Sequence, residues 1–266
     1  MEIDLSLCLV GTSPAALSLL RAVYETADPV SFEAIVVELA PGGLAERILA
    51  EFPATKVFAN TTSRSYSKDR NLALRLAEGR YVALLDQDAV VRPGCLRRLL
   101  DFMDDTPEAG IAGPKAINAY GRCEPSARTL PGLRLLLGYY GPLGGNPPLP
   151  NLVKQHRLGD WDGNATREVE LLAGGCHLIR QELLEELGYL DESFLTPLAE
   201  IEFYLRAQRA GWHQYFVHDA EFLHLNPGRY HPRLAGESYP WGDYFRDVGR
   251  YLSRKWLPRQ SIYPVR

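Results

Sequence analysis

The sequence has little cysteine and no paired cysteine motif. Its four cysteines, Cys8, Cys95, Cys123 and Cys176, lie far apart and form no C-x-x-C pair. This spacing excludes a zinc knuckle and a dithiol redox motif. We therefore expect buried, reduced thiols.

The sequence also has no excess of positive charge and no recognisable leader pattern. The chain of 266 residues has 29 Lys and Arg against 33 Asp and Glu, which gives a net charge of −4. This balance argues against nucleic-acid binding, which needs clustered basic side chains. The N-terminus has no basic stretch ahead of an apolar run, so no signal peptide is expected. The uncharged segment 135–153 contains four prolines, which predicts a loop rather than a membrane span. Together these features predict a cytoplasmic protein.

Strand-like and helical patterns alternate along the chain. Strands are predicted over residues 3–10, 32–39, 81–85, 111–117, 168–172 and 214–217. Helices are predicted over residues 14–26, 44–51, 67–78, 93–103, 181–187 and 197–210. Ser67 is the expected N-cap of the third helix, and Gly79 its stop signal. Over the first hundred residues this alternation is typical of a parallel sheet with crossover helices.

Two aspartates stand where such a sheet would bind a ligand. Asp86 and Asp88 directly follow the predicted strand 81–85, and ligands of open α/β sheets lie beyond the carboxyl ends of the strands. Alternate side chains share a side of a strand, so both carboxylates can address one ligand. Carboxylates of this kind suit Mg²⁺ or Mn²⁺. The alternative is an aspartate turn that caps the helix at Pro93, but the position after a buried strand favours the ligand site.

Several segments together resemble the family 2 glycosyltransferases. The resemblance to the central block rests on residues 67–71 (SKDRN), 77–88 (AEGRYVALLDQD) and 93–94 (PG). Residues 174–180 (GGCHLIR), 188–194 (GYLDESF) and 206–212 look like the acceptor half of the rhamnosyltransferase-like branch. Each motif is weak alone, but they occur in the family's order over roughly residues 3–225, which makes the joint signal specific.

The resemblance implies a fold, a domain division and an activity. The fold is GT-A: an α/β, mostly parallel Rossmann-like sheet flanked by helices, with a smaller mixed acceptor-side sheet and a C-terminal helix. Residues 1–225 would form the glycosyltransferase domain, divided into a donor half (1–115) and an acceptor half (116–225), with a tail at 226–266. The implied reaction is inverting transfer from a nucleotide-diphospho-sugar to a hydroxyl of a polysaccharide, lipid-linked glycan or other glycoconjugate.

Two other functions remain open at this point. Residues 199–202 read Ala-Glu-Ile-Glu where the family usually has Glu-Asp-x-Asp, so the chain could instead be a catalytically impaired nucleotide-sugar-binding protein. A nucleotidyltransferase would need a glycine-rich, lysine-containing phosphate loop after the first strand. Residues 11–14 (GTSP) do not provide one.

The resemblance also assigns a metal site and a base. A divalent cation, Mg²⁺ or Mn²⁺, would neutralise the departing diphosphate, with Asp88 as its ligand and Asp86 nearer the ribose or metal-bound water. His224 falls where many members carry a further metal-side histidine; the alternative is a structural histidine. Inversion needs a carboxylate opposite the leaving group. The resemblance places the family's base at Glu200. Its alternative is a helix-start acid after Thr196, favoured by the helix macrodipole.

Further contacts are expected on the donor and acceptor sides. Thr12 follows the first strand, Glu38 stands where the family has an aspartate that meets the nucleobase, and Arg70 could pair with the diphosphate. Gly175 and Glu202 are the expected acceptor contacts. The alternative for Glu202 is an ordinary i,i+4 salt bridge with Arg206.

The tail has a different composition from the rest of the chain. From residue 241 onward it carries six basic residues against two acidic ones. The apolar residues with helical spacing are Trp241, Tyr244, Phe245, Val248, Leu252 and Trp256. A basic amphipathic helix can lie on an anionic membrane, which would place the protein peripherally at the inner membrane face through residues 241–257. The alternatives are packing on the catalytic domain or on a second copy in a homodimer.

Overall fold

The computed structural model describes residues 3–11, 15–26, 30–39, 43–60, 65–141, 149–173, 175–225 and 240–256. The strands are β1 (Leu5–Gly11), β2 (Phe32–Glu38), β3 (Lys56–Ala59), β4 (Tyr81–Asp86), β5 (Ala89–Val91), β6 (Ala109–Asn118), β7 (Cys123–Glu124), β8 (Ala127–Arg128), β9 (Arg167–Glu168), β10 (Leu171–Leu172), β11 (Cys176–Arg180) and β12 (His213–His224). The helices are α1 (Ala15–Thr26), α2 (Leu44–Glu51), α3 (Tyr66–Leu76), α4 (Cys95–Asp105), α5 (Leu133–Gly138), α6 (Pro150–His156), α7 (Gln181–Leu187), α8 (Leu198–Ala210) and α9 (Trp241–Trp256).

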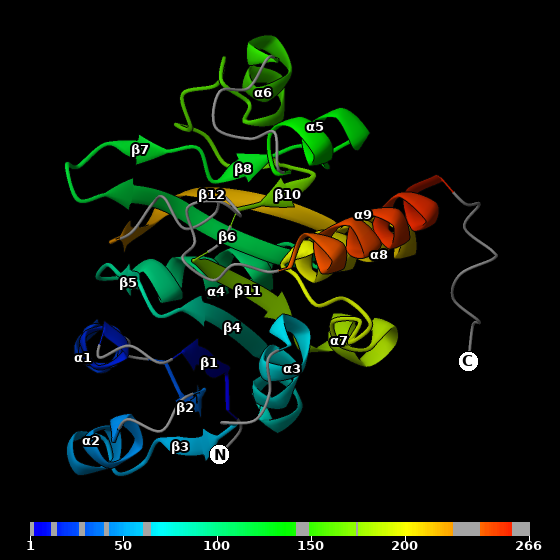
Figure 1. The fold of residues 1–266 in the computed structure, drawn as a ribbon. Coiled ribbons are helices and arrows are strands. Elements are labelled where there is room, and N and C mark those ends of the chain that lie inside the picture. The colour runs from blue at the N-terminus through cyan, green and yellow to red at the C-terminus, as the bar shows by residue number, and fades with distance from the viewer. Residues whose placement is uncertain are drawn as a thin grey trace.

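One mixed sheet runs through the molecule, with strand order β3-β2-β1-β4-β11-β6-β12-β5 (Figure 1). Its first four strands are parallel, as the βαβ pattern predicts. β11 then lies antiparallel between β4 and β6, and β6 pairs with β12 in parallel. The acceptor-side strands thus mostly join the same sheet, and β8 and β10 form a separate antiparallel pair. The expected α/β arrangement, a mixed and mainly parallel sheet flanked by helices, is confirmed.

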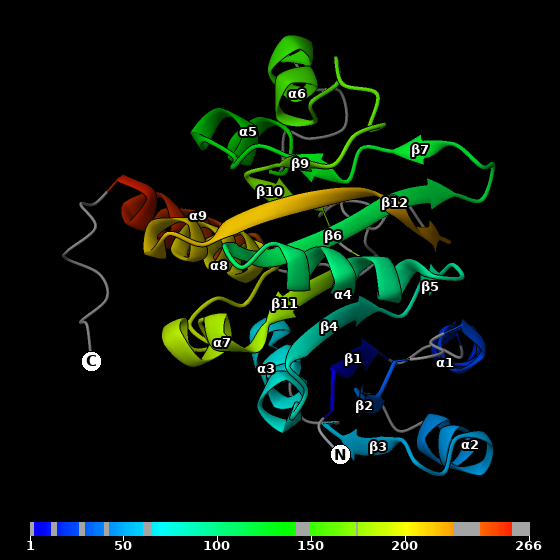
Figure 2. The same ribbon diagram turned by 180° about the vertical axis from the view of Figure 1, so that it is seen from behind.

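Helices cover both faces of this sheet, and each face has its own apolar core. One core contains side chains of α3, α8 and α9, among them Leu74, Phe203 and Tyr251. The other contains side chains of α1 and α4, among them Leu20 and Leu99. Figure 2 shows α4 in front of the sheet, with α8 and α9 behind it. Every residue of β1 is buried, as is typical of a strand covered on both faces.

Some boundaries differ from those expected. Ser65, not Ser67, is the N-cap of α3, because the Ser67 hydroxyl donates instead to the carbonyl of Phe194 at 2.7 Å. The segment 135–153 is not simply a loop, since α5 ends in it and α6 begins in it. β12 is much longer than the predicted 214–217 strand, and β11 was not predicted from its short, glycine-flanked sequence. Cys123 is exposed, contrary to expectation, whereas the other three cysteines are buried.

The basic amphipathic helix forms as α9, and three of its cations contact the domain. Arg250 donates to the carbonyl of Ser193 at 2.6 Å. Arg254 pairs with Asp191 and Glu202, and Lys255 donates to the carbonyl of Leu130 at 3.1 Å. The packing of this helix on the rest of the described chain is therefore established. Within the described ranges, no helix is long and apolar enough to cross a bilayer.

Candidate active site

The carboxyl end of β4 and the start of β11 are paired closely, backbone against backbone. The Asp86 amide donates to the carbonyl of Gly175 at 2.9 Å, and the Gly175 amide donates to Asp86 Oδ2 at 3.3 Å. Gly175 has φ +86°, and a Cβ there would lie 2.6 Å from a ring carbon of Phe222. Only glycine is free of strain at such a position. Gly175 thus fixes Asp86 at the carboxyl end of β4. The expected acceptor contact of Gly175 stays a prediction.

Side chains from β4, α3 and α8 converge on one arginine beside that edge. Arg70 pairs with Asp86 Oδ1 at 2.8 Å and, through its Nε, with Glu200 Oε1 at 3.1 Å. The Arg70 side chain is 12% exposed and that of Glu200 16%, so both ion pairs are largely shielded from water. The structure therefore brings together three of the predicted site residues, although they come from elements far apart in the sequence.

Tyr66 completes this cluster and was missed by the sequence reasoning. Its hydroxyl donates to Glu200 Oε1 at 2.6 Å, and the Arg70 guanidinium carbon lies 3.6 Å from the centre of its ring. Burial, followed by the charges of Glu200 and Asp86, raises the pKa of Tyr66 well above its usual value of 10.0. The hydroxyl therefore keeps its proton and acts as a donor.

Asp88 lies on the other side of the same edge, next to β12. His224 Nε2 is 4.0 Å from Asp88 Oδ2, too long for a hydrogen bond. Both atoms could nevertheless reach one cation at about 2.1 Å each, the usual Mg²⁺ distance to oxygen and close to the usual metal distance to imidazole nitrogen. The two aspartates thus take different partners, Asp86 toward α3 and Asp88 toward β12.

Glu124, from β7, contacts the second ring nitrogen of His224. No pattern in the sequence singled it out. Its Oε2 lies 2.9 Å from His224 Nδ1, and the His224 side chain is 4% exposed. A carboxylate behind a metal-binding histidine fixes its tautomer and ring orientation. In the part of the chain that the structure describes, no three His, Cys, Asp or Glu form a closed metal cluster. Two protein ligands are nevertheless sufficient when phosphate and water complete the shell.

Three predicted site residues lie elsewhere or outside the description. Thr12 is outside the described residues. Glu38 is buried at the end of β2 and accepts the amide of Leu44 at 3.2 Å, so it caps α2, and its donor contact stays a prediction. Glu202 is fully buried between Arg206 and Arg254, at 3.4 and 3.0 Å. Its predicted acceptor contact does not fit this position, because α8 turns Glu202 toward α9 and away from Glu200.

His177 is a further buried group near the cluster. Its ring lies 5.7 Å from the ring of Tyr204, edge to face. Burial lowers its pKa from 6.5, against the opposing charges of Glu200 and Asp86. The His177 imidazole is therefore neutral, and it lies near the carboxylates of Glu200 and Asp86. The only sequence signal was its position beside the glycine pair.

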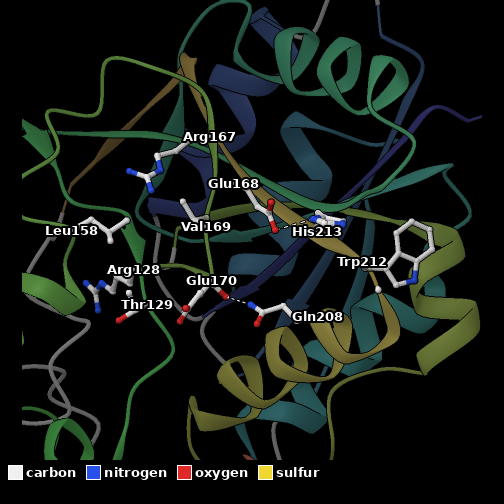
Figure 3. A pocket seen from close by; sticks show the side chains of 11 residues that line it. Arg128, Thr129, Leu158, Arg167, Glu168, Val169, Glu170, Gln208, Trp212 and His213 are labelled. Atoms are coloured by element: carbon white, nitrogen blue, oxygen red, sulfur yellow. Dashed lines mark hydrogen bonds and ion pairs between the residues drawn. The ribbon is translucent and has the colours of Figure 1, made fainter. Parts of the chain in front are cut away.

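A separate cavity of about 560 Å³ lies at the other end of β12 (Figure 3). It is lined by Arg128, Arg167, Glu168, Gln208 and His213, among others. Glu168 lies 2.8 Å from His213 Nδ1, and Gln208 donates to the carbonyl of Glu170. β12 separates this cavity from His224 by roughly 30 Å at strand rise. None of its lining residues belongs to the cluster around Asp86 and Glu200, so the two are distinct.

Comparison with known proteins places these features in context. Residues 31–188 match the family model described as glycosyl transferase family 2. An N-acetylglucosaminyl-diphospho-decaprenol L-rhamnosyltransferase of Mycobacterium tuberculosis (strain CDC 1551 / Oshkosh) is 30% identical over 149 residues, which are 54% of this chain and 46% of the relative. The low-salt glycan biosynthesis hexosyltransferase Agl10 of Haloferax volcanii is 27% identical over 151 residues, covering 55% and 44%. The chain thus spans less than half the length of these relatives.

Solved structures are similar over nearly the whole chain. Staphylococcus aureus TarS 1–349 in complex with UDP-GlcNAc has a TM-score of 0.64 at 17% identity, covering 97% of this chain and 68% of that one. GalNAc-T7 with UDP, GalNAc and Mn²⁺ has a TM-score of 0.66 at 17% identity, covering 98% and 52%. At this identity the likeness establishes the fold.

Proposed function

The chain belongs to glycosyl transferase family 2, and from that premise we propose that it moves a sugar from a nucleotide-diphospho-sugar to a hydroxyl of a lipid-linked glycan, with inversion. The carrying observation is the convergence of Glu200 and Asp86 on Arg70, which supports a carboxylate base beside the aspartate at the end of β4. The mycobacterial relative, named for a lipid-linked acceptor, supports this acceptor class.

The proposed step is a single displacement. The acceptor O–H bond breaks and its proton passes to Glu200, while the acceptor oxygen bonds to the anomeric carbon. The bond from that carbon to the diphosphate oxygen breaks, and its electron pair leaves with the diphosphate. The base and the leaving group must lie on opposite faces of the sugar. An impaired binding protein is less well supported, because Tyr66 and Arg70 hold Glu200 in a mostly buried position beside Asp86.

Asp88 and His224 are the residues that would hold a divalent cation. Their 4.0 Å separation and the Glu124 contact behind His224 fit such a group. A bound cation would stabilise negative charge on the departing diphosphate. Arg70, next to Asp86, could supply a further positive charge to the donor.

A thermal-shift panel of nucleoside diphosphates, with and without Mn²⁺, tests this site. We expect one diphosphate to raise Tm by several degrees only when Mn²⁺ is present, because a ligand that binds the native state stabilises it. Asp88→Ala should abolish this shift. Glu124→Gln should weaken the affinity for Mn²⁺ about 10–100-fold, as for other groups behind metal ligands.

The matched control for Glu124→Gln is Glu168→Gln. It alters another glutamate–histidine Nδ1 contact, at the opposite end of β12. An unchanged shift in Asp88→Ala would remove Asp88 from the site. If Glu124→Gln and Glu168→Gln bound Mn²⁺ with equal affinity, Glu124 would have no part in the metal site.

We propose that the chain also contacts a membrane through the exposed border of the apolar face of α9. Trp241, Phe245 and Trp256 are 39%, 44% and 69% exposed, and their spacing places them along one side of the helix. Since several of the helix's cations bind the domain, this contact would rest on aromatic insertion more than on charge. Tryptophan and phenylalanine suit the interface between headgroups and acyl chains. A homodimer through the same surface stays the alternative.

Co-sedimentation with vesicles of phosphatidylcholine and phosphatidylglycerol tests the membrane contact. We expect the double variant Trp241→Ser/Phe245→Ser to reduce the bound fraction several-fold, because each buried aromatic side chain contributes about 1.5–3 kcal/mol. Tyr120→Ser is the control, since Tyr120 is 88% exposed on another surface. Equal sedimentation of wild type and double variant would contradict the contact.

A further inference from the structure

The two carboxylate oxygens of Glu200 have unequal surroundings. Oε1 accepts the Tyr66 hydroxyl at 2.6 Å and lies 3.1 Å from Arg70 Nε. Within the described part of the chain, the contacts of Glu200 run through Oε1 and none through Oε2. Oε1 is thus held by one hydrogen bond and one ion pair, and Oε2 is left to meet an acceptor hydroxyl.

The anchor is itself rigidly held. The hydroxyl of Ser67, next to Tyr66, donates to the carbonyl of Phe194 at 2.7 Å. Asn71 donates to the carbonyl of Leu190 at 2.8 Å and accepts the Leu190 amide at 3.0 Å. These bonds fix α3 to the segment that leads into α8, the helix that carries Glu200. Tyr66 and Glu200 therefore belong to one connected frame, despite a sequence separation of 134 residues.

Arg70 links this anchor to the donor side. Its guanidinium stacks over the Tyr66 ring at 3.6 Å and reaches Asp86 Oδ1 at 2.8 Å. The stacking fixes the ring plane, and with it the direction of the Tyr66 hydroxyl. A single guanidinium thus sets the base at a constant distance from the aspartate at the end of β4.

We propose that Tyr66 is a positioning residue for the transfer: its hydroxyl, backed by Arg70, holds Oε1 of Glu200 so that Oε2 receives the acceptor's proton. This inference rests on the proposed function, because it assigns the geometry of the same base. Without the hydroxyl, the glutamate retains its charge but can rotate about its last side-chain bonds, and its approach to the acceptor becomes a minority state.

Tyr66→Phe tests this role, because it removes one oxygen and keeps the ring under Arg70. We expect kcat for transfer to fall about 10–100-fold, the scale of a misplacement near 1 Å. The KM for the donor should stay within about twofold, because the base makes no ground-state contact with the nucleotide. The control is Tyr81→Phe, which deletes another buried tyrosine–carboxylate hydrogen bond, 2.7 Å long, to Asp104 at the far end of β4. The control should transfer at the wild-type rate.

A double-mutant cycle with Glu200→Gln separates positioning from general destabilisation. If Tyr66 acts through Glu200, adding Tyr66→Phe to Glu200→Gln should lower the residual rate by less than about twofold. The positioning role would be overturned if the rate losses of the two substitutions multiplied in full in the double variant, or if Tyr66→Phe kept the wild-type kcat. The proposed function would still stand in either case, provided that Glu200→Gln is slow. Equal rates in wild type and Glu200→Gln would instead overturn the proposed function.

Discussion

Glu200→Gln is expected to lower the transfer rate by about 10²–10⁴-fold, the usual contribution of a positioned general base. The amide keeps the size of the carboxylate and can still accept the Tyr66 hydroxyl bond through its oxygen, but it cannot take a proton. Donor affinity should therefore change little. Transfer of a labelled sugar gives kcat, and calorimetry with the nucleoside diphosphate gives the affinity.

The control for this substitution is Glu182→Gln. Glu182 also lies in the first turn of a helix, α7, and is exposed to solvent. It should transfer like wild type, which excludes a general effect of losing a helix-start acid. A wild-type rate in Glu200→Gln would make the assignment of the base wrong. A large loss of donor affinity would show that Glu200 binds the donor instead.

Asp247→Ala is expected to produce the largest loss of stability. Asp247 of α9 is fully buried, and its Oδ2 accepts the amides of Leu195 and Thr196 at 2.8 and 2.9 Å. Its Oδ1 lies 3.5 Å from Arg250. Alanine would leave two amides without their acceptor and remove the ion-pair partner of Arg250, a loss of about 3–5 kcal/mol. Because these amides directly precede α8, the segment that positions Glu200 should loosen as well.

Denaturant unfolding measures this effect directly. Asp243→Ala is the matched control, because Asp243 lies on the same helix and pairs only at the surface, at 2.9 Å from Arg246. Its removal should change the free energy of unfolding by less than about 0.5 kcal/mol. Similar unfolding free energies for the two variants would contradict the role given to the buried carboxylate.

Local patterns were sufficient to locate much of the site. A buried apolar run ending in Asp86 and Asp88 is visible in the sequence, and the sheet places its carboxyl end at the cleft. The spacing of Glu200 and Glu202 predicted that they do not share a face of the helix, and the structure agrees. The two side chains differ in their surroundings: Glu202 is fully buried against Arg254, whereas Glu200 pairs with Arg70.

Contacts between distant segments account for what the sequence could not indicate. Tyr66 meets Glu200 across 134 residues, and Glu124 meets His224 across 100. Neither Tyr66 nor Glu124 belongs to a motif, so only the folded sheet reveals their partners. The orientation of Glu202 likewise depends on α9, whose Arg254 pairs with it; the sequence left packing on the domain and contact with lipid both open for this helix. Side-chain pairing of this kind has no local signature.

The most direct test of the whole account is a crystal structure with the stabilising nucleoside diphosphate and Mn²⁺. The account predicts an ion within about 2.3 Å of both Asp88 and His224, with the diphosphate between that ion and the side of the cleft where Arg70 and Glu200 lie. A diphosphate bound instead at the distant cavity beside Arg128 and Arg167 (Figure 3), with no ion at Asp88, would contradict it.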